Sequence, residues 1–184
     1  MRAKLAKAVR ETFARKLQEA LPQFIPVESQ RDSGNRLYKW GVAPDVNFYV
    51  YLQLSAKSHE DSFTIELGCS RREYPFDHGA RDPNHEKDGA VRFRLPQLYR
   101  EEWRPKTGRE PWWWIGPQKS AKESIARTME RVKSGKLPEK DEGLMPIEQA
   151  LPLVEPQVQD AIERLKRYGM PFFQKFAKQH AIQT

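Results

Sequence analysis

Two stretches in which polar and apolar residues alternate constrain the fold of this chain most. Residues 46–54 read VNFYVYLQL and residues 62–70 read SFTIELGCS, so apolar side chains recur at every second position in both. A period of two is typical of antiparallel strands that bury one face and expose the other. The polar residues 56–61 between them suit a hairpin loop. The sequence therefore predicts a β-hairpin in this region.

Two shorter alternating runs flank this hairpin. Residues 36–42 predict a first strand at the edge of the sheet, and residues 90–95 predict a last one. The connections between the four strands are too short for helical crossovers, which favours an antiparallel meander within residues 36–95. The only cysteine, Cys69, falls on the apolar side of its strand. We therefore expect it to be a small buried hydrophobic residue and not a reactive thiol.

An amphipathic helix is predicted before the sheet, at residues 1–21. Its apolar side chains are spaced four residues apart, and most other positions are charged. The spaced residues are Leu5, Val9, Phe13, Leu17 and Leu21. Pro22 is expected to end the helix, because proline cannot donate the backbone hydrogen bond that a further turn requires.

Helices are also predicted after the sheet, within residues 119–180. Ser120 and Glu123 have the spacing of a capping box, in which each side chain bonds a free backbone amide at the start of a helix. We expect the helix that follows to turn Met129 inward and to end at Gly135.

The C-terminal part of this region is predicted to form three further helices. Prolines at 146 and 156 suit first-turn positions, which indicates a short helix at residues 146–154 and a longer one at 156–168. Gly169 is expected to close the longer helix. A final short helix turns phenylalanines toward the core, namely Phe172, Phe173 and Phe176.

The order of these elements predicts a single α+β domain over residues 1–184, with the helices packed on one face of the sheet. The other face would then carry polar and aromatic side chains together. These are Tyr49, Tyr51, Gln53, Thr64, Glu66, Arg92 and Arg94. Tyrosine and arginine are enriched at binding hot spots, so we expect Tyr49, Tyr51, Gln53, Arg92 and Arg94 to bind a partner. The alternative is a solvated strand face, for which the same residue types are well suited.

Three consecutive tryptophans, Trp112 to Trp114, follow the sheet. Successive residues of an extended segment point to opposite sides, so Trp113 should face away from its two neighbours. We expect one side of the run to close the core and the other to lie at a surface rim. Trp113 is included among the predicted partner-binding residues.

No catalytic or metal-binding arrangement is evident in the sequence. The loop at residues 77–88 concentrates aspartate, glutamate and histidine, but without an established metal-ligand spacing. Asp45 and Glu66 lie where a nuclease would hold a metal ion, yet Gly68 stands where that chemistry needs lysine. We expect no catalytic residue, metal or cofactor, and we keep a metal-dependent hydrolase that uses the 77–88 loop as a third hypothesis.

The formal net charge of +7 allows an anionic partner. Six of the first twenty residues are basic and two are acidic, so nucleic-acid binding through this surface is the second hypothesis. We expect a cytoplasmic location for three reasons. The chain has one cysteine, no signal-like segment and no long apolar run. The oligomeric state is not indicated.

Four features together resemble a group of small bacterial domains of unknown function: the strand ending in LQLS, the strand FTIELG, the tryptophan-rich segment after the sheet, and the C-terminal YGMPFFQKF. The resemblance spans roughly residues 10–180. It implies an α+β fold and supplies no catalytic residue. Members of this group are suggested to include immunity proteins for secreted toxins. The leading hypothesis is therefore a non-enzymatic, cytoplasmic protein that binds a protein partner. An immunity or antitoxin-like factor is one specific version of this hypothesis.

Overall fold

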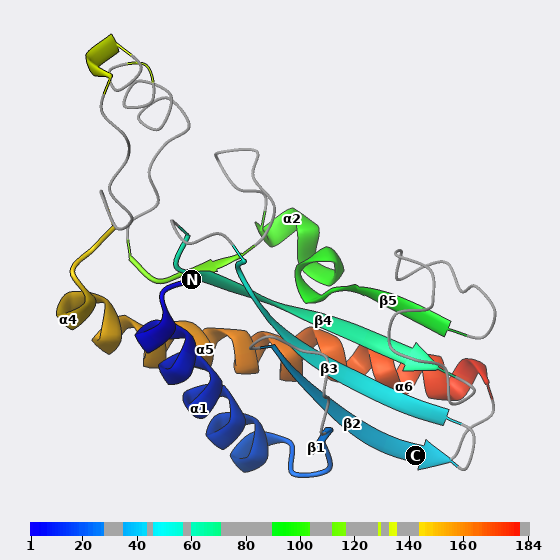
Figure 1. Cartoon of the computed structure of the whole chain (residues 1–184). Coiled ribbons are helices and arrows are strands. Elements are labelled where there is room, and N and C mark those ends of the chain that lie inside the picture. The colour runs from blue at the N-terminus through cyan, green and yellow to red at the C-terminus, as the bar shows by residue number, and fades with distance from the viewer. Residues whose placement is uncertain are drawn as a thin grey trace.

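A computed structural model of the chain has the α+β architecture that the sequence predicts, with a helix, an antiparallel sheet and C-terminal helices (Figure 1). It describes residues 1–27, 35–43, 46–56, 60–70, 90–103, 112–116, 129, 133–135 and 144–180. The helices α1, α5 and α6 lie on one side of the sheet.

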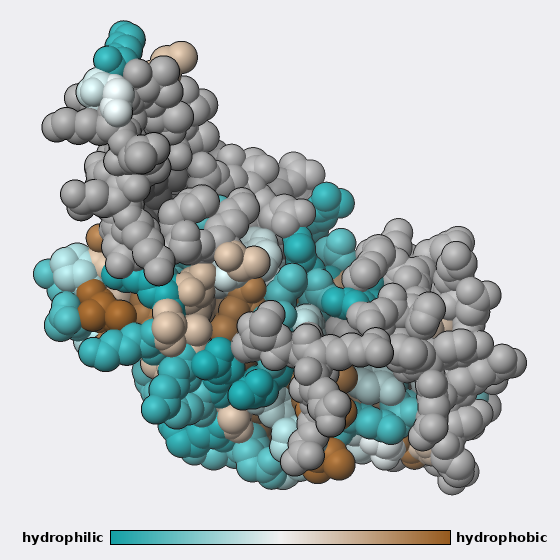
Figure 2. Space-filling view, in the orientation of Figure 1, coloured by the Kyte–Doolittle hydropathy of each residue, from teal (hydrophilic) through white to brown (hydrophobic). Residues whose placement is uncertain are grey.

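The first helix, α1 (Ala3–Ala20), forms where the four-residue spacing predicts it. Leu5, Val9, Phe13 and Leu17 are fully buried, and the surface over this helix is mostly hydrophilic (Figure 2). The backbone amide of Leu21 donates to Leu17 O at 2.8 Å, after which Pro22 permits no further helical turn. Burial of one apolar stripe therefore fixes α1 on the core.

The central sheet is an antiparallel meander, as predicted, but with more strands than the expected four. Its strands follow the order β1 (Ile25–Val27), β2 (Arg36–Ala43), β3 (Val46–Leu54), β4 (Ser62–Ser70) and β5 (Ala90–Arg94). A further strand, β6 (Trp113–Trp114), pairs with β4 beside the start of that strand. The prediction that residues 36–42 form an edge strand is wrong, because β1 lies outside them. Strands of two or three residues are too short to show a period of two.

The C-terminal region is one nearly continuous helical run. It comprises α4 (Ile147–Ala150), the 3₁₀ turn η2 (Leu151–Leu153), α5 (Val154–Arg164), the π-helical turn η3 (Leu165–Gly169) and α6 (Met170–Gln179). The predicted end of a helix at Gly169 is wrong, since this residue has a helical φ of −69°.

Gly169 lies at a closely packed position between helix and sheet. A Cβ at this position would lie 2.7 Å from Leu165 Cδ1 and 3.2 Å from Leu67 Cδ1. The missing side chain lets the π-helical turn approach strand β4. A glycine that reads as a helix end in the sequence is in fact a point of contact between helix and sheet.

The helix predicted from Ser120 to Gly135 lies mostly outside the described residues. Met129 of this helix is expected to face the core. It is 63% exposed, so this expectation is wrong. Gly135 has a φ of +64°, a left-handed conformation that fits its expected place at the end of a helix. The 3₁₀ turn η1 (Leu95–Tyr99) and the short helix α2 (Arg100–Trp103) follow β5.

The core lies between the sheet and the three helices. Phe173 of α6 stacks on Phe48 of β3 with ring centroids 4.7 Å apart. Phe13 of α1 contacts Tyr38 of β2 at 5.7 Å. Cys69 is 1% exposed, as expected for a buried apolar residue. The apolar side chains of the alternating strands therefore lie on the face of the sheet that the helices cover.

A buried ion pair ties the first helix to the sheet. Arg2 Nε donates to Asp61 Oδ2 at 2.8 Å, and a second guanidinium nitrogen of Arg2 donates to Met145 O at 2.7 Å. The carbonyl of Asp61 accepts from the amide of Ile115 at 2.8 Å. Asp61 is 3% exposed, so it joins α1, β4, the segment after β6 and the segment before α4 at one enclosed point.

Candidate functional site

The polar side chains that the alternation assigned to the other face do lie together. Strand pairing places Tyr51 opposite Glu66, and it places Gln53 opposite Thr64. Arg94 pairs with Glu66 from the other side of β4. Directly paired residues of an antiparallel sheet share a face. We call the set Tyr49, Tyr51, Gln53, Thr64, Glu66, Arg92 and Arg94 the Tyr/Arg face.

Much of the Tyr/Arg face is buried. Tyr49 is 7% exposed, Tyr51 8%, Glu66 6% and Thr64 0%. The expectation that both tyrosines present their rings to a partner is therefore corrected. Arg92, Arg94 and Gln53 remain partly exposed. Alternation shows which side chains share a face, but it does not show how far that face is enclosed.

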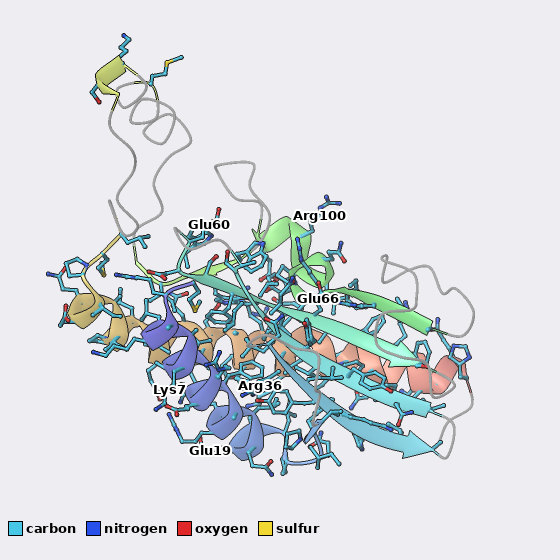
Figure 3. All side chains as sticks on the ribbon, viewed as in Figure 1. Lys7, Glu19, Arg36, Glu60, Glu66 and Arg100 are labelled. Carbon is cyan, nitrogen blue, oxygen red and sulfur yellow. The ribbon has the colours of Figure 1, made fainter. Side chains whose placement is uncertain are left out.

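Glu66, which Figure 3 labels, pairs with two arginines of this face. Arg92 Nε donates to Glu66 Oε2 at 2.6 Å, and Arg94 Nε lies 3.9 Å from Glu66 Oε1. The guanidinium of Arg92 also lies 5.5 Å from the ring centroid of Tyr51, within cation–π range. A buried carboxylate is stable only when it is paired and hydrogen-bonded, and these contacts supply both conditions.

Asn35 forms hydrogen bonds with Tyr51 and Leu54 beside the Glu66 ion pairs. Its amide nitrogen donates to the Tyr51 hydroxyl at 2.9 Å, and its side-chain oxygen accepts from the amide of Leu54 at 2.9 Å. The side chain therefore bridges the start of β2 and the end of β3. The hydroxyl of Tyr51 is thereby held in position on the face.

The tryptophan run alternates as predicted, but the core-facing indole is that of Trp113. Its ring stacks on Phe63 at 5.6 Å, and its Nε1 donates to Asp160 Oδ2 at 2.8 Å. Trp113 is 1% exposed. The prediction that Trp113 is available to a partner is thus corrected. Trp112 and Trp114 are partly exposed instead.

Trp112 and Trp114 extend the Tyr/Arg face at one end. Trp114 pairs with Ser62 of β4, two residues before Thr64. The guanidinium of Arg94 lies 5.4 Å from the ring centroid of Trp112. We call Gln53, Arg94, Trp112 and Trp114 the Trp/Arg rim. Alternation shows that Trp112 and Trp114 lie on the same side of the run. The pairing of Trp113 with Phe63 shows that this side is the one away from the core, and the sequence does not indicate that pairing.

Three buried polar atoms around this rim have no hydrogen-bond partner in the described structure. They are Gln53 Oε1, Ser62 Oγ and Trp114 Nε1. Gln53 pairs with Thr64, and Trp114 pairs with Ser62, so the three side chains lie on neighbouring positions of one face. Each unpaired buried polar group costs about 1–3 kcal/mol, and such groups are rare in native structures.

A family comparison covers most of the chain. The family model described as a domain of unknown function (DUF4304) matches residues 41–175. The chain belongs to this family. The DUF4304 match begins within β2 and ends within α6, so it includes every residue of the Tyr/Arg face and leaves α1 outside. Neither the curated proteins nor the solved structures contain a match.

The described residues of this DUF4304 protein form neither a metal-binding cluster nor a membrane-spanning helix. Within the described ranges, no group of three or more histidine, cysteine, aspartate or glutamate side chains could hold a metal ion. The third hypothesis, a metal-dependent hydrolase, uses the loop at residues 77–88. This loop and Asp45 lie outside the described residues. None of the helices in the described part of the chain is long and apolar enough to span a membrane.

Proposed function

We propose that the protein is a non-enzymatic binding protein that holds a protein partner at the Trp/Arg rim. The observation that carries this proposal is the set of three unpaired buried polar atoms, Gln53 Oε1, Ser62 Oγ and Trp114 Nε1. A bound partner that supplies hydrogen bonds to the partly exposed side chains of Gln53 and Trp114 recovers the free energy lost by leaving them unpaired.

The three atoms favour a peptide segment as the bound group. Gln53 Oε1 accepts a hydrogen bond, Trp114 Nε1 donates one, and the Ser62 hydroxyl does either. A peptide unit offers one N–H donor and one C=O acceptor, which complements this set. Because the side chains of Gln53 and Trp114 are partly exposed, a small movement of either brings its polar atom to a partner.

The aromatic and cationic side chains of the rim support the same function. Tryptophan, tyrosine and arginine are the residue types most enriched at binding hot spots. Arg94 is positioned by Trp112 on one side and by Glu66 on the other. A side chain that is already ordered loses less conformational entropy on binding, which increases affinity.

The electrostatics of the Tyr/Arg face favour recognition over catalysis. Its single carboxylate, Glu66, already binds Arg92 and faces Arg94. A carboxylate engaged in this way is a poor proton acceptor, since a general base must be free to reach a substrate proton. The face therefore supplies contacts and charge complementarity, with no nucleophile and base side by side.

One form of this proposal is an immunity or antitoxin-like factor in the bacterial cytoplasm. Its partner would then be a toxin. The net charge of +7 suits an acidic partner, because charges of opposite sign accelerate association and exclude wrong partners. The rim itself requires only a partner with an accessible peptide segment.

Site-specific photo-crosslinking in the native cell tests the proposal. A photoreactive amino acid at Gln53 should give a discrete protein adduct, whereas the same group at exposed Lys7 of α1 should not. The adduct should disappear on Arg94→Ala with Trp112→Ala and persist on Lys4→Ala with Lys7→Ala. An absent adduct at Gln53, or one insensitive to the rim substitutions, contradicts partner binding at the rim.

A further inference from the structure

The last helical segment exposes positive charges that no acidic residue accompanies. From Arg164 to Thr184 the sequence holds five lysine and arginine residues and neither aspartate nor glutamate. Arg167 of η3 and Lys175 and Lys178 of α6 are exposed. We call these three residues the α6 basic face. Lys166 is not included, because its Nζ lies 3.7 Å from Glu163 Oε2.

The α6 basic face is one side of an amphipathic segment. Phe173, Phe176 and Ala177 are buried in the core on the opposite side. Lys175 and Lys178 are three residues apart in α6 and therefore lie about 60° apart around that helix. Arg167 precedes them in the π-helical turn η3 of the same helical run.

The cations of this face have little internal compensation. Lys175 and Lys178 form no ion pair within the part of the chain that the structure describes. The guanidinium of Arg167 lies 5.1 Å from the ring centroid of Tyr168, a contact that leaves its charge unneutralised.

The basic N-terminal helix differs in this respect. Lys7 lies 3.9 Å from Glu11, Arg15 3.3 Å from Glu19, and Lys16 2.8 Å from Glu155. Arg2 pairs with buried Asp61. Three of the five cations of α1, namely Lys7, Arg15 and Lys16, therefore have an acidic neighbour. Uncompensated charge is found on α6 instead.

Two properties of this face select its partner. A row of cations without acids complements a polyanion with regularly spaced charges, and duplex nucleic acid carries one negative charge per 3.4 Å of each strand. Proteins that bind single strands add exposed aromatic rings on which bases stack. Among the described residues, the exposed large hydrophobic side chains are Ile25 and Met129, neither of which lies on α6. The same observation disfavours insertion into a membrane surface.

We propose that the α6 basic face binds the phosphate backbone of double-stranded DNA, without reading its sequence. Gln174 and Gln179 are exposed beside the cations and supply further donors to phosphate oxygens. The site is independent of the Trp/Arg rim, because α6 lies on the opposite side of the sheet (Figure 1). The protein therefore has two binding surfaces, one for a peptide segment and one for DNA.

A salt titration of DNA binding tests this site. The probe is a fluorescent DNA duplex of about 20 base pairs, and the logarithm of the affinity should fall linearly with the logarithm of the salt concentration. Replacing Lys175 and Lys178 by glutamine should lower the affinity at low salt by about 10-fold and reduce the salt slope by about 2, since each phosphate contact contributes about 1. Both lysines are exposed, so the unfolding midpoint should not change.

The matched control is Lys4→Gln with Lys7→Gln, which removes the same charge from α1. This variant should change the affinity by less than about 2-fold if α6 is the site. Equal losses in the two variants would show a net-charge effect and overturn the proposal. Tighter binding to a single-stranded RNA of the same length, or to vesicles with anionic lipid, would also overturn it. So would a wild-type protein that does not bind the duplex at low salt.

Discussion

Arg92 Nε donates a hydrogen bond to Glu66 Oε2 across 2.6 Å, on the face of the sheet opposite α1, α5 and α6. Their side chains are 11% and 7% exposed, so the pair is shielded from water. Tyr51 borders it through the guanidinium of Arg92, and Arg94 approaches from β5. The Tyr/Arg face therefore has an enclosed ionic centre and a more exposed rim.

Breaking this pair should destabilise the fold. Glu66→Gln removes the carboxylate that Arg92 binds, and we expect the free energy of unfolding to fall by about 3 kcal/mol. Denaturant titration measures the change. Replacing both Glu66 and Arg92 by leucine should cost less than the sum of the two single replacements, because neither member of this close pair then remains without the other. Strict additivity would contradict the coupling between the two side chains.

Of the tryptophans whose exposure the structure describes, Trp113 should be the one most shielded from solvent. In the wild-type protein, iodide quenching should leave a protected fraction of the tryptophan fluorescence, because Trp113 is 1% exposed. Trp113→Phe should remove that fraction and destabilise the fold by about 2 kcal/mol through lost core volume. Trp112→Phe, the matched control, should keep the protected fraction. If the two variants lose the same fraction, the assignment of Trp113 to the core is wrong.

Gly169→Ala should destabilise the protein although alanine is the better helix former. The added Cβ would meet Leu165 Cδ1 at 2.7 Å, and we expect a cost of about 1–3 kcal/mol from overpacking. Leu165→Val removes the δ-carbon that collides. The double variant should therefore lose less unfolding free energy than the sum of the losses in the two single variants. A stabilised Gly169→Ala variant would contradict the overpacking against Leu165 and Leu67.

Stability should fall at alkaline pH because of a buried tyrosine. Burial raises the pKa of Tyr38 to about 12 from an ordinary value of 10.0. The folded protein retains this proton while the unfolded chain loses it, so Tyr38 stabilises the fold fully below pH 10 and loses that contribution between pH 10 and 12. The loss is about 1.4 kcal/mol per pH unit in this window.

Tyr38→Phe should reduce this alkaline loss. Unfolding free energies measured at about pH 8 and about pH 11 should differ less in the variant than in the wild type. Burial raises the pKa of Tyr99 as well, so Tyr99→Phe should act in the same direction. An unchanged pH dependence in both variants would contradict the burial of these hydroxyl groups.

Long and strongly periodic elements of the fold could be predicted from the sequence. The four-residue spacing predicted α1, and alternation predicted β3 and β4, because eighteen and nine residues give many repeats of a period. The strands β1 and β6 have three and two residues, so their existence depends on pairing and not on pattern. Gly169 illustrates the same limit. Its partner Leu67 lies in β4, and no local signal indicates that contact.

The composition of the candidate site was predictable, but its burial and its pairing were not. Alternation correctly placed Tyr51, Glu66 and Arg92 on one face. The ion pair depends on the register between β4 and β5, which the sequence does not specify. The side of the tryptophan run that closes the core likewise depends on Phe63 lying opposite Trp113. Tertiary register, and not residue type, decides which side chains remain accessible.

The most direct test of partner binding at the Trp/Arg rim is the affinity of the crosslinked partner, once purified, for three forms of the protein. Replacing Arg94 and Trp112 by alanine should raise the dissociation constant by at least about 30-fold, which corresponds to about 2 kcal/mol and to the hot-spot range. Replacing Lys4 and Lys7 by alanine should leave it within about 2-fold. Equal affinity of the wild-type protein and the rim variant would contradict the account.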